Sequence, residues 1–159
     1  MVSTSRHQRT RLFGEPLTND ERRLLQLRSE GYEIDELMAQ FHRSRGTITQ
    51  WSTNIYQKFG LYNEPIKHMF TFAVCIALSC KAIRGPAKTK YPPKLAPHLL
   101  AVTELVPYGL TNAQIAAKLR IKRKERVDEW LMQANECCKT LTRTHLAAFA
   151  IVHNLIEFP

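Results

Sequence analysis

The sequence predicts an all-α protein made of two tandem four-helix units, and three observations support this class. Apolar residues recur every three or four positions through most of the 159-residue chain, which is the periodicity of amphipathic helices. No stretch shows the strict apolar–polar alternation typical of a half-buried strand. The chain also matches itself at a shift of 78 residues, which places Gly31 on Gly109 and Leu37 on Ile115.

Capping residues mark the first helix. Thr18 and Glu21 have the spacing of a capping box, which predicts a helix over 19–30, and Gly31 is the glycine expected just past its end. A second, shorter apolar pattern with helical spacing covers 34–41. These two helices are therefore expected to be joined by a short turn.

The third and fourth helices of the first unit follow a polar turn. Ser44 is the predicted N-cap of a helix that carries Ile48, Trp51 and Ile55 on one face. The fourth helix is predicted over 65–84, because proline is well suited to the first helical position and Gly-Pro stops the helix afterwards.

A segment rich in chain breakers divides the chain. Residues 85–94 contain one glycine and three prolines, and they are predicted to link a first unit at 17–84 to a second unit at 95–159. One extra residue in the turn of the second unit raises the shift to 79, which places Trp51 on Trp130. Both units are therefore expected to contain two helices, a turn and two more helices.

The charge of the chain favours acidic partners. Lys and Arg number 23 against 14 Asp and Glu, for a net charge of +9, which attracts polyanions such as nucleic acid. Residues 1–16 are expected to form a flexible basic arm that carries Arg6, Arg9 and Arg11.

Several classes of protein are not expected. The longest apolar run, 69–80, is shorter than the ~20 residues that cross a bilayer, and no secretory signal is present, which predicts a cytoplasmic protein without a membrane partner. The four cysteines lack zinc-site spacing and are interpreted as reduced core residues, so neither a metal nor a cofactor is expected. No catalytic motif is present, so no enzyme is predicted.

The first unit contains a series of motifs that are found together in one bacterial family. They are an LTxxE start, a helix ending in glycine, a turn followed by Thr-Ile, then Asn-Ile and Lys-Phe-Gly. The matching positions are Leu17, Thr18, Glu21, Leu24 or Leu25, Leu27, Gly31, Glu36, Leu37, Phe41, Ser44, Thr47, Ile48, Asn54, Ile55, Lys58, Phe59 and Gly60. This segment resembles the LuxR/GerE-type (NarL/FixJ-like) helix-turn-helix domain of transcription regulators. The second unit resembles the same domain more faintly, as a degenerate copy.

The third helix of the first unit is the candidate DNA-reading element. With Ile48 at the centre of the buried face, the outward side chains are small or carry amides, and the resemblance implies that this helix reads bases. Glutamine can pair bidentately with adenine and threonine can contact the thymine methyl, while the residues at the helix ends are suited to phosphates. The candidate DNA-binding residues are Ser44, Arg45, Thr47, Thr49, Gln50, Thr53, Asn54, Gln57 and Lys58.

The corresponding helix of the second unit has a different surface. With Val127 at the centre of its buried face, three outward residues are Glu125, Glu129 and Glu136, which phosphates would repel. The preceding turn is basic and is suited to phosphate or partner contacts through Arg120, Lys122, Arg123, Lys124 and Arg126. The second unit is therefore expected either to contact the DNA backbone or to present its acidic helix to a protein.

The fourth helices carry wide apolar stripes that include Phe70, Val74, Leu146 and Phe149. The resemblance implies dimerisation through this helix. Two arrangements follow, namely a pseudo-dimer of the two units within one chain, or a homodimer of two chains.

The expected function is sequence-specific binding of double-stranded DNA by a transcriptional regulator. The alternative is an adaptor that keeps the fold without reading DNA and binds RNA polymerase or another regulator through the acidic helix.

Overall fold

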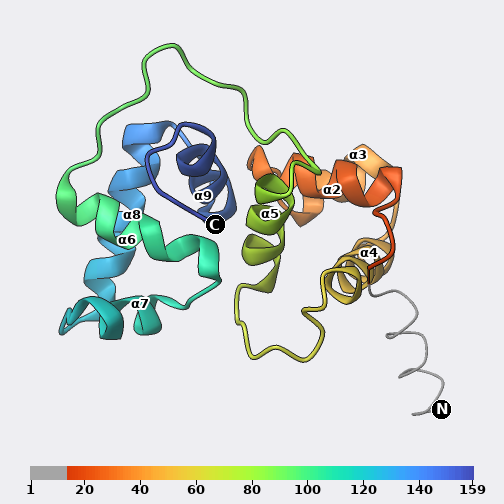
Figure 1. The fold of residues 1–159 in the computed structure, drawn as a ribbon, viewed down its shortest axis with the longest axis horizontal. Coiled ribbons are helices and arrows are strands. Elements are labelled where there is room, and N and C mark those ends of the chain that lie inside the picture. The colour runs from red at the N-terminus through yellow and green to blue at the C-terminus, as the bar shows by residue number, and fades with distance from the viewer. Residues whose placement is uncertain (1–13) are drawn as a thin grey trace.

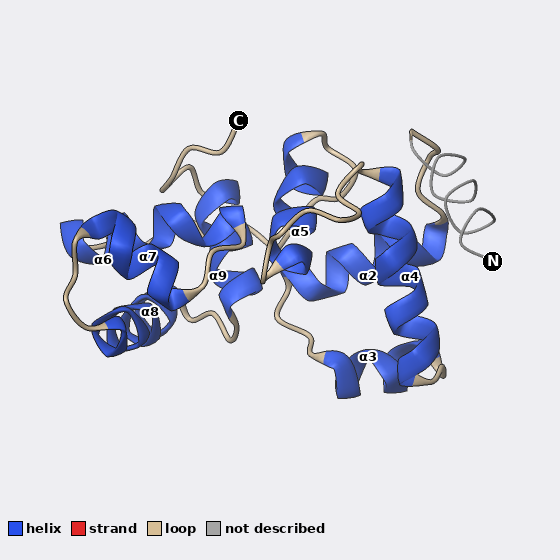
Figure 2. Cartoon of the chain, turned by 90° about the horizontal axis from the view of Figure 1, so that it is seen from below, coloured by secondary structure: helices blue, strands red, loops and turns tan. Residues whose placement is uncertain are grey.

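The computed structural model describes residues 14–159, and this part of the chain is all-helical. Its elements are α2 (Asn19–Ser29), α3 (Ile34–Phe41), α4 (Arg45–Lys58), α5 (Met69–Ser79), α6 (Pro97–Leu105), the 3-10 helix η1 (Val106–Tyr108), α7 (Asn112–Leu119), α8 (Lys124–Cys138) and α9 (Arg143–Val152) (Figures 1 and 2). The predicted basic arm lies mostly outside the described residues. Its last part is held by the Gly14 N–H, which donates to the Lys58 carbonyl at 3.2 Å.

The helices repeat with the spacing that the sequence shows. The helices α2 and α3 start at Asn19 and Ile34, and α6 and α7 start 78 residues later at Pro97 and Asn112. The helices α4 and α8 start 79 residues apart, because the turn before α8 is one residue longer. Capping follows the sequence as well, since the Thr18 side chain accepts from Glu21 N–H and the Glu21 carboxylate accepts from Thr18 N–H.

The prediction of the fourth helix was wrong at both ends, because α5 is shorter than 65–84. Before α5 the chain contacts the second half instead of forming a helix, because the His68 N–H donates to the Gly109 carbonyl at 3.1 Å. After α5, Lys81 adopts a left-handed conformation (φ +62°) and the Ala82 N–H bonds back to the Ala77 carbonyl, which ends the helix.

The linker is longer than predicted and its first part is anchored. The chain is irregular over 80–96 between α5 and α6, and it arches above both halves (Figure 1). Gly85 is buried with φ +79°, where a Cβ atom would lie 2.6 Å from Leu78 and 2.9 Å from Val152. Further along, the Thr89 N–H donates to His153 Nε2 at 2.9 Å.

Each half has its own buried cluster, and the two clusters meet at α5 and α9. Leu24, Leu37 and Ile48 lie in the first cluster, while Ile115 and Val127 lie in the second. Each fully buried side chain of this size stabilises the fold by roughly 1.5–3 kcal/mol.

One residue of α5 and one residue of α9 each belong to the buried cluster of the other half. Cys75 of α5 belongs to the cluster of the second half, and Ala148 of α9 belongs to that of the first. These two residues are 73 positions apart, as are Thr71 and Thr144, whose buried hydroxyl groups share a hydrogen bond of 2.8 Å. The helices α5 and α9 lie side by side in both views (Figures 1 and 2).

The outer contacts between the halves are reciprocal too. A Cβ atom on Gly31 would lie 2.7 Å from His145 Nδ1 and 3.3 Å from the Leu141 side chain, and one on Gly109 would lie 2.4 Å from the Ile66 side chain and 2.8 Å from the His68 carbonyl. Gly31 and Gly109 are the equivalent glycines of the two halves, and His68 and Leu141 are again 73 positions apart. Each of these two glycines therefore lies against the other half, at contacts that include the pair His68 and Leu141.

No helix within residues 14–159 is long and apolar enough to cross a membrane. The expectation that all four cysteines are core residues was wrong for two of them. Cys75 and Cys138 are buried, whereas Cys80 ends α5 and Cys137 points outward from α8.

Candidate nucleic-acid interface

The helix α4 begins where the sequence predicts. Ser44 has extended backbone angles and its hydroxyl oxygen accepts from the Thr47 N–H at 3.3 Å, as an N-cap does. The Ser44 and Thr47 hydroxyl groups also lie 3.2 Å apart. Both predicted phosphate-binding hydroxyls are thus gathered at the N-terminus of α4, where the helix dipole favours an anion.

One face of α4 is buried in the core. Ile48 and Ile55 are 1% and 0% exposed, and Trp51 packs edge-on against Phe41 of α3 with ring centroids 5.0 Å apart. Because these contacts set the rotation of α4 about its axis, they also determine which side chains face away from the core.

The opposite face carries the predicted base-reading residues. Arg45, Gly46, Thr49 and Gln50 are exposed, and half-buried residues extend the same face. Those half-buried residues are Thr53, Asn54 and Gln57. The helix holds no Asp or Glu. A surface of amides, hydroxyls and one guanidinium group can donate to and accept from base edges without repelling phosphates.

Two hydrogen bonds order this face. The Gln50 amide donates to Asn54 Oδ1 at 3.1 Å, and the Thr53 hydroxyl donates to the Thr49 carbonyl at 3.2 Å. Arg45 reaches Asp35 of α3 at 3.8 Å, and both side chains are largely exposed. The amides are held without being buried, so they can exchange partners with a ligand.

Lys58 is the exception, because the structure contradicts its predicted contact with phosphate. Its Nζ lies 2.6 Å from Glu21 Oε1, and the two side chains are 6% and 3% exposed. The amine contacts α2, where it neutralises the carboxylate that caps that helix.

A small cavity of about 260 Å³ lies between α4 and the rest of the first half. Arg28, Tyr56 and Phe70 line it together with Thr49 and Thr53 of the candidate face. Burial lowers the pKa of Arg28 and raises the pKa of Tyr56 to about 12. The Arg28 guanidinium lies 5.1 Å from the centre of the Phe70 ring, so the cation is stabilised by an aromatic face.

The equivalent helix α8 presents an acidic surface. Glu125, Asp128, Glu129 and Glu136 are all exposed, and Met132 between them is 63% exposed. Asp128 accepts a hydrogen bond from the Asn112 side chain of α7. Four carboxylates on one helix oppose entry into a groove walled by phosphates.

The structure brings the predicted basic cluster together on the turn before α8 and the first turn of that helix. All five residues are exposed, and Arg123 lies 4.0 Å from Glu125. The cluster comprises Arg120, Lys122, Arg123, Lys124 and Arg126. Arg123 occupies the N-cap of α8 without a side-chain cap, whereas Ser44 caps α4.

The apolar residues predicted to join the halves pack in their own units. Val74 lies in the first cluster, Leu146 and Phe149 lie in the second, and Phe70 packs edge-on against Tyr56 at 6.2 Å.

Sequence reasoning missed the small residues where α5 packs against α9. They are Thr71, Cys75, Thr144 and Ala148. Their signal is a shift of 73 residues between the fourth helices, which differs from the 78 and 79 found elsewhere.

No protein-family model, curated protein or solved structure matches the chain. The likeness to the LuxR/GerE-type domain therefore stays a prediction that rests on the residues of the chain itself.

Proposed function

We propose that the protein is a sequence-specific DNA-binding regulator of transcription, built from two tandem helix-turn-helix units. The observation that carries the proposal is the face of α4, which is free of carboxylates, lined with amides and hydroxyls, and set in orientation by Ile48, Trp51 and Ile55. In this function α4 enters the major groove, and Gln50 and Thr53 contact base edges. The protein would then act in the cytoplasm.

The second unit has a different role in this proposal. The acidic surface of α8 disfavours base reading, while the basic cluster before it is suited to the phosphates of the backbone. A specific observation also favours the adaptor alternative, because Met132 is an exposed apolar side chain among carboxylates. Such a surface fits a partner protein that offers cations around an apolar contact.

We propose further that the two units form a pseudo-dimer within one chain. The reciprocal contacts of Gly31 with Leu141 and of Gly109 with His68 support this arrangement, as does the Thr71–Thr144 hydrogen bond. The surface through which the resembled family dimerises is then already occupied, and a single chain is the DNA-binding unit.

Selection of duplexes from a random pool, followed by affinity measurements, tests the function. We expect a motif to be enriched, and Gln50→Ala or Thr53→Ala to cost roughly 1–3 kcal/mol on that motif with little change on mixed-sequence DNA. Gln133→Ala is the matched control, because it removes an exposed amide from α8. Enrichment of no motif, together with stoichiometric capture of a partner protein, would establish the adaptor instead.

A further inference from the structure

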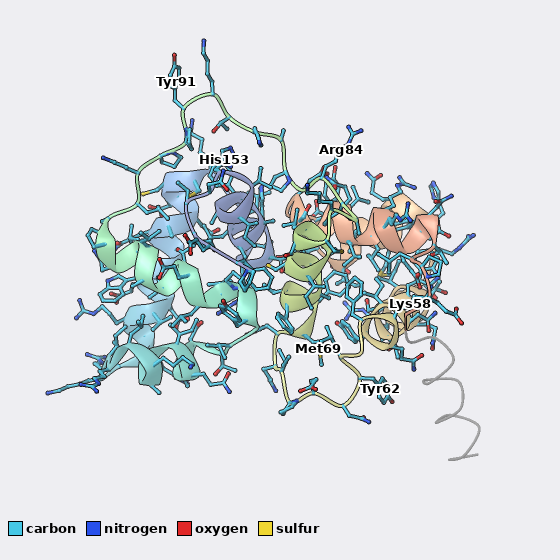
Figure 3. All side chains as sticks on the ribbon, viewed as in Figure 1. Lys58, Tyr62, Met69, Arg84, Tyr91 and His153 are labelled. Atoms are coloured by element: carbon cyan, nitrogen blue, oxygen red, sulfur yellow. The ribbon has the colours of Figure 1, made fainter. Side chains whose placement is uncertain are left out.

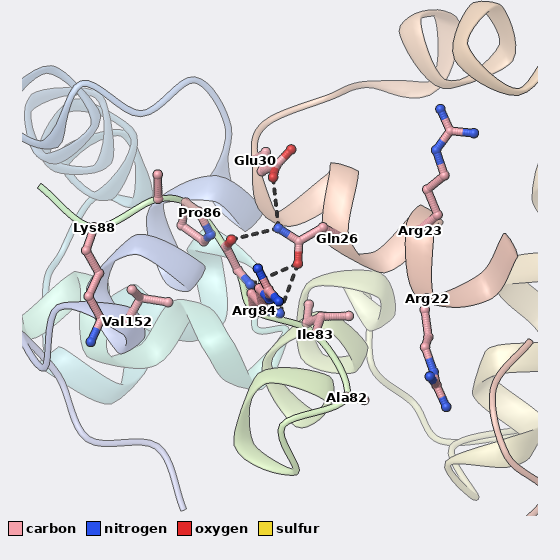
Figure 4. A pocket seen from close by; sticks show the side chains of 12 residues that line it. Arg22, Arg23, Gln26, Glu30, Ala82, Ile83, Arg84, Pro86, Lys88 and Val152 are labelled. Carbon is pink, nitrogen blue, oxygen red and sulfur yellow. Dashed lines mark hydrogen bonds between the residues drawn. The ribbon is translucent and has the colours of Figure 1, made fainter. Parts of the chain in front are cut away.

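A basic groove lies between α2 and the start of the linker, away from the residues proposed to read bases. It encloses about 760 Å³. Arg22 and Arg23 of α2 and Arg84 and Lys88 of the linker supply four cations, while Glu30 is the one carboxylate in its lining (Figure 4). We name these four cations and the space between them the basic groove.

The carboxylate in the basic groove does not neutralise its cations. Glu30 Oε1 accepts a hydrogen bond from the Gln26 amide at 2.8 Å. Within residues 14–159, none of the four cations is within 4 Å of a carboxylate oxygen. Arg23 instead lies over the Phe41 ring, with its guanidinium carbon 4.9 Å from the ring centre, and its Nη2 donates to Gln40 Oε1 at 3.4 Å. Like charges gathered without counter-charges raise the local potential and attract an anion.

The wall formed by the linker is fixed in place. Gln26 accepts from the N–H groups of Arg84 and Gly85 at 3.0 Å each and donates to the Gly85 carbonyl at 2.7 Å (Figure 4). The left-handed, buried Gly85 is confined between Leu78 and Val152. The backbone that carries Arg84 is therefore held at a defined place relative to α2, so binding an anion there does not first require ordering of this part of the linker.

The positive charge continues along the chain beyond the basic groove. Lys90 and Lys94 are exposed on the same linker, and the sequence holds no Asp or Glu from residue 65 to residue 103. Tyr91 forms the outermost part of this stretch with 82% of its surface exposed (Figure 3). A compact anion would use the basic groove alone, whereas an extended row of cations fits a polymer of phosphates.

We propose that the basic groove and the linker bind the phosphate backbone of nucleic acid as a second contact, separate from base reading by α4. The identity of the polyanion rests on the proposed function, and the contact carries no sequence information of its own. Its contribution is electrostatic, so it depends on salt concentration through the release of counterions.

The test measures the affinity of the full chain for a mixed-sequence 25-base-pair duplex over a series of salt concentrations. Replacing Arg84 and Lys88 together by Gln should reduce the log–log salt slope by about 0.9 for each phosphate that the variant no longer neutralises. Lys67→Gln with Lys139→Gln is the control, because it removes the same charge from exposed sites outside the basic groove. Circular dichroism melting of both double variants verifies that they fold.

The outcomes separate this proposal from the function of α4. A smaller slope in the basic-groove variant alone, with an unchanged ratio of affinities for motif and mixed DNA, supports the proposal. An unchanged slope, or an equal reduction in the control, overturns it. Loss of tripolyphosphate binding with an unchanged DNA slope also overturns it, because the basic groove would then bind a small phosphorylated molecule. Absence of any enriched motif would contradict base reading by α4 without affecting these slopes.

Discussion

Lys58 illustrates how far the role of one residue depends on its surroundings. In the sequence it is a cation at the end of the proposed reading helix, which favours a contact with phosphate. In the fold its amine and the Glu21 carboxylate are both buried and lie 2.6 Å apart. The same carboxylate oxygen accepts from the Thr18 N–H, so the pair connects the cap of α2 to the end of α4.

We predict that Lys58→Met destabilises the protein by about 3–5 kcal/mol, because it leaves the Glu21 carboxylate buried without a counter-charge. Urea unfolding monitored by circular dichroism gives the free energy of unfolding. Adding Glu21→Gln should recover part of the loss, since the neutral side chain no longer needs the cation. Unchanged stability accompanied by a smaller DNA salt slope would mean that Lys58 reaches phosphate after all.

At the scale of the element, α4 and α8 occupy equivalent places in their units and differ in chemistry. Ile48 and Val127 are buried alike, which keeps both helices in the same relation to their cores. Their N-termini differ, because the Ser44 hydroxyl oxygen accepts a backbone hydrogen bond, whereas the Arg123 side chain carries only donors and makes no cap hydrogen bond. A cation therefore stands at the N-cap of α8, where a capping hydroxyl stands at that of α4.

Substitutions at the two N-cap residues should change the free energy of unfolding in opposite directions. Ser44→Ala removes a capping acceptor and should cost about 1 kcal/mol, whereas Arg123→Ser supplies one at a position with extended backbone angles and should add roughly 0.5–1 kcal/mol. Thermal unfolding of the two single variants measures both effects. A loss of stability in Arg123→Ser would show that the arginine makes a contact more valuable than a cap.

At the scale of the whole molecule, the two halves share one small-residue junction. Thr71 and Thr144 are 4% and 6% exposed, and each hydroxyl has the other as its partner. Cys75 and Ala148 extend the close approach of α5 and α9. Nearby, burial lowers the pKa of His145, and its Nδ1 accepts from the Leu141 N–H at 3.1 Å, which suits a neutral imidazole at this contact.

We predict strong coupling between the two threonines. Thr71→Val or Thr144→Val alone should cost about 1–3 kcal/mol by leaving one buried hydroxyl without a partner, and the double variant should cost less than the sum of the two. Sedimentation should give a monomer mass for the parent chain at micromolar concentration. Additive losses, or a dimer whose population rises with concentration, would contradict the paired junction as an interface within one chain.

The helical class, the caps at Thr18 and Ser44 and the buried faces of the helices follow from the order of the residues, because local hydrogen bonding and apolar periodicity act over a few residues. The sequence also indicated the contrast between the surfaces of α4 and α8. The three-dimensional packing was needed to find that Lys58 is an internal counter-ion, that α5 starts at Met69, and that Arg84 and Lys88 line one groove with Arg22 and Arg23. Each of these depends on contacts between residues far apart in the chain, whose energy appears only when the two halves and the linker pack together.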